Sequence, residues 1–138
     1  MAVKKTATSS AAAATQSDGN ADADFIQEAY GDALKNQVQV LITNYAANTP
    51  DPEKKFENGL TIIRKARDQA LKSASAPTPK GKTDADFIQE AYGDALNNQV
   101  QVLVANYIAN MPDPENAFAD GLTIIRKARD QALTLALG

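Results

Sequence analysis

The sequence predicts an all-α protein made of two tandem, near-identical helical hairpins. The segment 22–71 recurs as 84–133, at an offset of 62 residues. Within each copy the apolar residues step by three and four, as they do on one face of a helix. A Pro-Asp-Pro turn also stands in the middle of each copy. We therefore expect four main helices with four-helix-bundle-like packing, within one chain or between chains.

The repeat also predicts how the 138 residues are divided. We expect a flexible tail rich in Ala, Ser and Thr (1–21), hairpin repeat 1 (22–72), a Pro/Ser/Ala/Lys connector (73–82) and hairpin repeat 2 (83–138). All eight aromatic residues lie inside the two repeats. Tail and connector bury too little apolar surface to offset the entropy lost on ordering, so both are expected to be flexible or extended.

The first helix of copy 1 is expected from Asp24 to about Asn48. Asp24, with Gln27 three residues later, is typical of an N-cap and its capping-box partner. Six amide side chains are expected to hydrogen-bond between helices and fix their register: Gln37, Gln39, Asn44, Gln99, Gln101 and Asn106. The apolar face is formed by Ile26, Tyr30, Leu34, Val38, Leu41 and Tyr45.

The segment 49–53 ends the first helix and begins the second. Pro50 disfavours helical geometry at the residue before it. Asp51 is expected to cap free amides, and Pro52 suits the first helical position, where its missing N–H costs nothing. The same signal recurs at 111–115, so each copy is predicted to be a hairpin.

Small and aromatic residues recur inside the predicted helices. The second helix is expected from about Pro52 to Leu71, with its inner face formed by Phe56, Leu60, Ile63, Ala66 and Ala70. A glycine inside a helix costs about 1 kcal/mol relative to Ala, so its recurrence favours close helix crossings. The residues that we expect to pack between helices are Gly31, Gly59, Gly93, Gly121, Tyr30, Tyr45, Phe56, Tyr92, Tyr107 and Phe118.

Composition excludes most enzymatic chemistry. The chain has no Cys and no His, which removes thiol and imidazole catalysis and the Ser-His-Asp triad. The best metal constellation, Asp24, Glu28 and Asp32 with their equivalents in copy 2, lacks the His that di-metal bundles add, and reads as a solvated acidic turn. We expect no catalytic residues, no metal and no cofactor, and interpret the chain as a non-enzyme.

Charge and hydropathy limit the partners. A net charge of −3 argues against nucleic-acid binding, which needs a concentrated basic surface. No apolar run is long enough to span a membrane. The segment 1–5 has the charge of an export signal, but no apolar region follows it, so we expect no cleaved signal peptide. A cytoplasmic protein and one exported without such a signal both remain open. The expected partner is another copy of the chain or another helical protein.

The copies differ at nine of their fifty shared positions, and eight of these lie between residues 42 and 58. The turn end of copy 2 has become more apolar and less basic. We interpret this end as a contact with a neighbouring subunit or a protein partner; fusion of two related sequences with incidental differences is the alternative. The residues assigned to the contact are Ile108, Met111, Ala117 and Ala119.

The plan of each copy, two helices about the Pro-x-Pro turn at 50–52 or 112–114, is similar to that of type III secretion needle subunits, which polymerise into helical filaments. The likeness covers the turn and the helix layout, and the duplication departs from that family. The likeness is one of helix layout. The duplicated hairpin, the amphipathic helices without a catalytic set and the small residues at packing positions favour a non-enzymatic structural protein that self-assembles into an oligomer or filament. The alternative is a single-chain pseudo-dimer that binds or regulates a protein partner, whether it arose by natural duplication or by engineered fusion.

Overall fold

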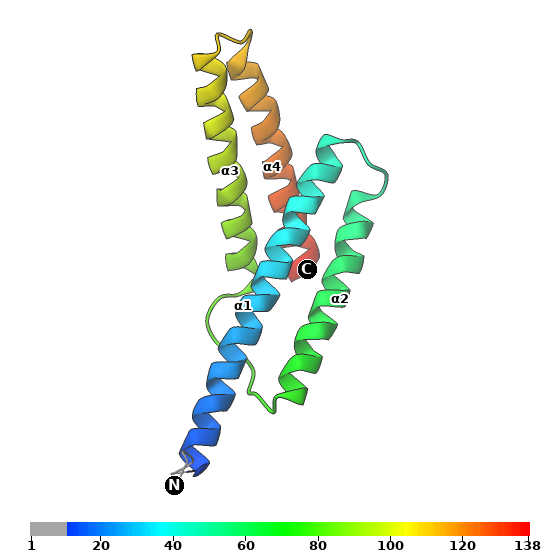
Figure 1. The fold of residues 1–138 in the computed structure, drawn as a ribbon. Helices are drawn as coiled ribbons and strands as arrows, with labels where there is room; N and C mark the ends of the chain where they lie inside the picture. The colour runs from blue at the N-terminus through cyan, green and yellow to red at the C-terminus, as the bar shows by residue number, and fades with distance from the viewer. Residues whose placement is uncertain (1–10) are drawn as a thin grey trace.

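The computed structural model describes residues 11–138, with side chains from residue 19 onward. This part of the chain folds into four helices, α1 (Ala11–Ala46), α2 (Pro52–Ser73), α3 (Asp84–Ile108) and α4 (Pro114–Leu137), and contains no strand. The predicted all-α class is therefore confirmed. Figure 1 shows two hairpins, α1 with α2 and α3 with α4, packed against each other. The part of the expected flexible tail before Ala11 lies outside the described residues.

The first helix begins earlier than the sequence predicted. It starts at Ala11 rather than at Asp24. Residues 11–14 are all alanine, the residue type with the highest helix propensity. Asp24 consequently lies inside α1, and its expected role as an N-cap is wrong. In α3 the cap is Thr83, whose Oγ1 accepts a hydrogen bond from the backbone N–H of Asp86, while the Asp86 carboxylate accepts one from Thr83 N–H.

The Pro-Asp-Pro turns close both hairpins. Pro52 and Pro114 occupy the first turn of their helices, as predicted. Asp51 and Asp113 both adopt the left-handed conformation, with φ of 52°, and neither side chain makes a capping hydrogen bond. The expected capping by Asp51 is therefore wrong. Aspartate occupies this position because it tolerates positive φ better than most residues do.

The core runs along the contact between the hairpins. Helix α1 packs against each of the other three helices, and α2 also packs against α4. These contacts are consistent with the predicted bundle. The buried core cluster comprises Tyr30, Leu34, Val38, Leu41, Phe56, Leu60, Phe87, Ile88, Ala91, Ala128 and Ala132.

The connector leaves α2 after Ser73 and returns alongside α1. Pro77 and Pro79 lie in a cleft with Asn20 and Ala23 of α1, and Gln27 Nε2 donates a hydrogen bond to the carbonyl oxygen of Lys82. This path lets α3 run parallel to α1. Across residues 11–138, none of the helices combines the length and apolar character that a membrane crossing requires.

Candidate interaction surfaces

The hairpins are staggered along their common axis. We call the end of each hairpin that carries the Pro-Asp-Pro turn its tip, and the opposite end its base. Hydrogen bonds between α1 and the segment entering or forming α3 join residues 52 to 55 positions apart, whereas equivalent residues are 62 positions apart. Hairpin 2 is therefore displaced towards the tip by seven to ten residues, or about 10–15 Å. In Figure 1 the tip of hairpin 2 extends beyond that of hairpin 1.

An aromatic contact holds the two hairpins together. The rings of Tyr30 and Phe87 meet edge to face, with centroids 6.4 Å apart and an interplanar angle of 77°. The Phe87 ring also covers Gly31, where an added Cβ would overlap the ring. Gly31 therefore forms a notch that receives Phe87, and this contact joins the middle of α1 to the base of α3.

A polar network surrounds the aromatic contact. Asp84, at the start of α3, accepts a hydrogen bond from the Tyr30 hydroxyl at 2.8 Å. Its carboxylate also forms an ion pair with Arg64 Nη2, at 2.6 Å. The same guanidinium donates to the carbonyl oxygen of Ala136 at 2.7 Å. Burial raises the pKa of the Tyr30 hydroxyl. Arg64 thus links α2 to both helices of hairpin 2, which is a more specific role than the solvated basic surface of an ordinary helix.

Side chains on the facing surfaces of α1 and α3 extend this contact between the two hairpins, which we call the junction. Lys35 Nζ lies 3.3 Å from Glu90 Oε1, and Gln39 Nε2 donates to the carbonyl oxygen of Ala91 at 3.1 Å. Lys82 also pairs with Glu90, and it is the main reason that the pKa of this carboxyl lies below its usual range. The expectation that Gln39 joins two helices is confirmed, whereas its equivalent Gln101 donates a hydrogen bond to Asn97 of its own helix. These pairs between α1 and α3 follow one another along the two helices, and all of them form only at one relative position of α1 and α3. They therefore fix the stagger between the hairpins.

Because of the stagger, the two copies of the repeated sequence bury different halves. Phe87 is 4% exposed, whereas its equivalent Phe25 is 67% exposed. Conversely, Val38 is fully buried, whereas its equivalent Val100 is 43% exposed. Hairpin 1 buries the half nearer its tip, and hairpin 2 buries the half nearer its base. One apolar surface is therefore left uncovered on each hairpin.

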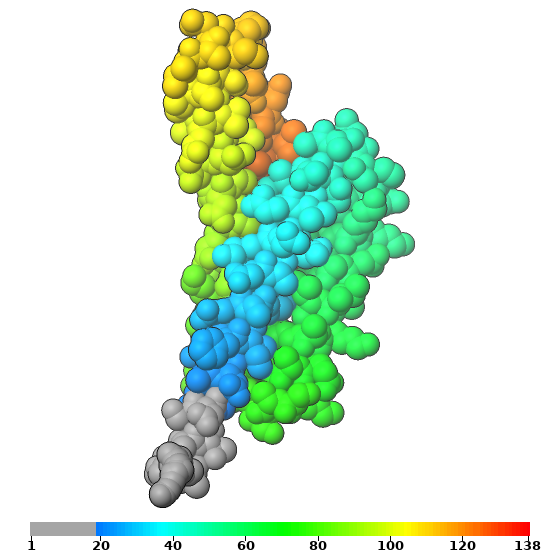
Figure 2. Space-filling model, in the orientation of Figure 1, coloured from blue at the N-terminus to red at the C-terminus, as the bar shows by residue number. Residues whose placement is uncertain are grey.

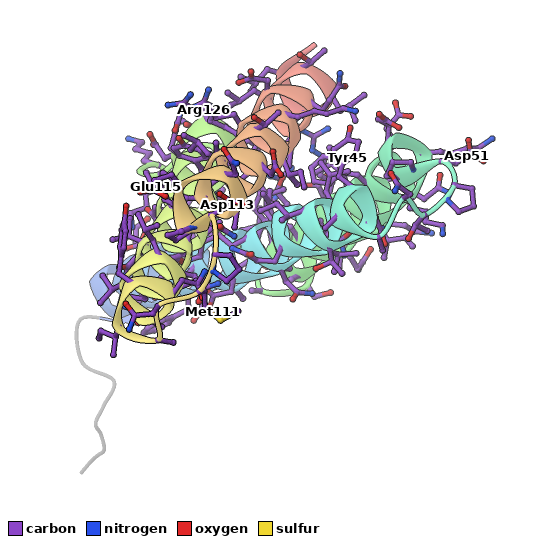
Figure 3. The ribbon with its side chains drawn as sticks, turned by 90° about the horizontal axis from the view of Figure 1, so that it is seen from above. Tyr45, Asp51, Met111, Asp113, Glu115 and Arg126 are labelled. Atoms are coloured by element: carbon purple, nitrogen blue, oxygen red, sulfur yellow. The ribbon has the colours of Figure 1, made fainter. Side chains whose placement is uncertain are left out.

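We call the uncovered surface of hairpin 2 the tip surface. Figure 2 shows this end standing clear of hairpin 1, and in Figure 3 the loop with Met111 and Asp113 lies apart from the loop with Asp51. All four residues that the sequence assigned to a contact, Ile108, Met111, Ala117 and Ala119, are exposed there. The large apolar residues of the tip surface are Val100, Val104, Tyr107, Ile108 and Met111.

We call the uncovered surface of hairpin 1 the base surface. It contains the exposed ring of Phe25, the exposed side chain of Ile62 and an open apolar groove between α1 and α2. The groove includes Ala66 and Ala70, whose equivalents Ala128 and Ala132 are completely buried in the junction. The lining of the groove is Ile26, Ala29, Tyr30, Ala33, Ile63, Ala66, Arg67 and Ala70.

The residues expected to pack between helices fall into two groups. Gly59 and Gly121 lie against Gln37 and Gln99, a contact within each hairpin. Gly31 packs between hairpins, but its equivalent Gly93 is exposed, with no heavy atom within 4 Å of an added Cβ. Within one chain the expected packing at Gly93 is thus not formed, because the stagger leaves nothing opposite it.

The expected aromatic packing residues follow the same division. Tyr30 and Phe56 are buried, whereas Phe118 and Tyr92 are half-buried. Tyr92 packs under the guanidinium of Arg129 at 4.5 Å. Tyr45 and Tyr107 donate hydrogen bonds of 2.7 Å to Glu53 and Glu115, across each tip. Tyr45 is half-buried and Tyr107 is exposed.

Sequence reasoning missed Phe25, Arg64 and Asp84. Phe25 and Phe87 are identical residues in identical local sequence, so nothing in the pattern separates the buried one from the exposed one. One available signal was Lys35, which is replaced by Asn97 in copy 2 and is the only difference outside residues 42–58. It lies on the surface by which α1 contacts α3.

Comparison with protein-family models, with curated proteins and with solved structures found no match to this chain. Among the described residues, no group of three or more carboxylates is arranged to hold a metal ion. The tip surface and the base surface are the candidate sites of interaction.

Proposed function

We propose that this protein is a non-enzymatic structural subunit that self-assembles, and that its assembly is open-ended. The observation that carries the proposal is that one sequence is buried in opposite halves in the two hairpins. The base surface of hairpin 1 exposes Phe25 and Ala66, whose equivalents Phe87 and Ala128 are buried in hairpin 2. The tip surface of hairpin 2 exposes Val100, whose equivalent Val38 is buried in hairpin 1. Two different surfaces that complement each other generate a head-to-tail contact, which propagates unless its rotation closes a ring.

The differences between the copies support the same conclusion. At the tip of hairpin 1, Ala46 and Thr49 line a cleft with Ile124 of hairpin 2. Their equivalents on the tip surface are the larger apolar residues Ile108 and Met111, and the equivalent of Ile124 is Ile62, which is 67% exposed. Larger apolar side chains at the tip therefore match an exposed apolar side chain at the base. A contact between chains has no covalent connector to help it, and needs this additional apolar area.

The proposal is tested by exchanging the tip residues for those of copy 1. The double substitution Ile108→Ala with Met111→Thr is expected to lower assembly at every concentration, measured by size-exclusion chromatography with light scattering and by negative-stain microscopy. Val102→Ala is the matched control, because Val102 and its equivalent Val40 are similarly exposed, at 45% and 42%, and lie outside the junction. A wild-type chain that remains at 14.7 kDa at all concentrations would contradict the proposal and favour the pseudo-dimer module.

A further inference from the structure

The surface of α1 that forms the junction with hairpin 2 recurs, exposed, on α3. On α1, Gly31 faces Phe87 of α3 and Lys35 pairs with Glu90 of α3. The buried Val38 lies on the same face, because these three residues are spaced by three and four. The same face of α3 carries Gly93, Asn97 and Val100, all three of them outside the core. Hairpin 2 thus presents to solvent nearly the same surface that hairpin 1 uses to hold hairpin 2.

We propose that the base of hairpin 1 of a second copy binds this surface with the same stagger, inserting Phe25 into the notch at Gly93 as Phe87 inserts at Gly31. This proposal rests on the proposed self-assembly and names the contact that produces it. The exposed ring of Phe25 has no role within its own chain that the structure shows, and the space above Gly93 is open. The occupant is a second copy because the two halves of the contact are already present, paired, in the intrachain junction.

The polar groups around the notch repeat as well. Within the chain, Arg64 pairs with Asp84 beside the aromatic contact. The equivalents are Arg126 and Asp22, both exposed, and Figure 3 shows Arg126 on the side of hairpin 2 away from Asp51. Arg126 of one chain then pairs with Asp22 of the next. Opposite charges at this position fix the register of the contact and oppose a reversed one.

The charge difference between the copies in this face, Lys35 against Asn97, weakens the contact between chains. Lys35 pairs with Glu90 inside the chain, whereas Asn97 faces the equivalent Glu28 of the next chain without a positive charge. Asn97→Lys restores the missing cation. This variant is expected to assemble at a lower concentration than the wild type. Non-specific hydrophobic association of the tip would not be strengthened by an added charge, so this result distinguishes the two.

The decisive experiment blocks one side of the contact at a time. Gly93→Leu places a side chain in the open notch, where an added Cβ has no heavy atom of its own chain within 4 Å, and Phe25→Ala removes the ring that enters the notch. Each variant is expected to keep its helical circular dichroism and to raise the concentration needed for assembly by about 30-fold or more, the effect of removing a central aromatic anchor. Because Gly93→Leu keeps its base surface, small amounts of it should also cap wild-type assemblies and shorten them.

A charge exchange tests the partner residues directly. Arg126→Asp and Asp22→Arg are each expected to assemble poorly alone, whereas an equimolar mixture should assemble, since each tip then meets a base of opposite charge. Wild-type chains that never assemble would overturn both this contact and the proposed function. Wild-type chains that assemble, together with Gly93→Leu and Phe25→Ala chains that assemble equally well, would overturn this contact alone and leave self-assembly standing.

Discussion

Hairpins 1 and 2 share forty-one of fifty residues, yet they meet their surroundings in different ways. In hairpin 1 the tip half of α1 is buried and the base is open, and in hairpin 2 the base is buried and the tip is open. The difference teaches that burial here is decided by the stagger and not by local sequence. A symmetric pairing would have covered both copies alike and left no complementary surfaces.

The largest expected difference between the hairpins concerns Phe87 and Phe25. Phe87→Ala should lower the free energy of unfolding by about 3–5 kcal/mol, since it empties the space between Tyr30 and Gly31. Phe25→Ala, measured in dilute solution, should change it by less than about 0.5 kcal/mol. Chemical denaturation followed by circular dichroism gives both values. If Phe87→Ala does not fold, Phe87→Leu provides the milder comparison, and equal effects at both positions would show that the stagger is wrong.

A smaller difference is expected at the paired glycines. Gly31→Ala should destabilise the chain by about 1–2 kcal/mol, because the new methyl group overlaps the buried ring of Phe87. Gly93→Ala should stabilise it by up to about 1 kcal/mol, because alanine favours the helix and nothing lies opposite. Thermal unfolding of the two variants measures the sign directly. Stabilisation at both positions would refute the notch at Gly31.

The smallest effect concerns the carboxylates at the two tips. The pKa of Glu53 is lowered chiefly because it accepts a hydrogen bond from Tyr45, with a smaller contribution from Lys127, whose Nζ lies 4.6 Å from the centroid of the Tyr45 ring. The pKa of Glu115 is lowered chiefly by Tyr107. A carboxyl group whose pKa is lowered by folding stabilises the protein at pH values above the ordinary glutamate pKa, about 4.3. This stabilisation is lost as the pH falls through the lowered pKa.

Two substitutions separate these contributions. Tyr45→Phe should raise the pKa of Glu53 towards its ordinary value and leave that of Glu115 unchanged. Lys127→Gln should raise the pKa of Glu53 by less, again without an effect on Glu115, because Lys127 reaches only the tip of hairpin 1. Titration of the carboxyl carbons by NMR provides the measurement. An equal response of Glu115 to Lys127→Gln would contradict the observed stagger.

Much of the fold follows from the sequence. The steps of three and four identify Tyr30, Leu34, Val38 and Leu41 as a buried face, and the Pro-Asp-Pro segments locate both turns, because proline acts on the backbone independently of tertiary context. The apolar pattern does not predict the start of α1, because the alanine run at 11–14 contains no large apolar residue, although alanine favours a helix even where little is buried.

The candidate surfaces are only partly predictable. Ile108 and Met111 were found because they differ from their equivalents in copy 1. Phe25 and Gly93 were not distinguished from Phe87 and Gly31, since two identical residues carry the same local information and only the long-range stagger assigns them different surroundings. The sequence does not reveal that Asp51 has a left-handed backbone and makes no capping hydrogen bond with its side chain.

The connector between α2 and α3 has a kinetic consequence. It ties the two sides of the Phe87 junction into one molecule, so that they meet at an effective concentration of the order of millimolar whatever the dilution. A contact between separate chains receives no such help. In an assembly of this kind, tethered and untethered junctions alternate, and dilution severs only the untethered ones. Material would therefore be exchanged with solution two hairpins at a time, and breakage under mechanical load would fall at every second junction.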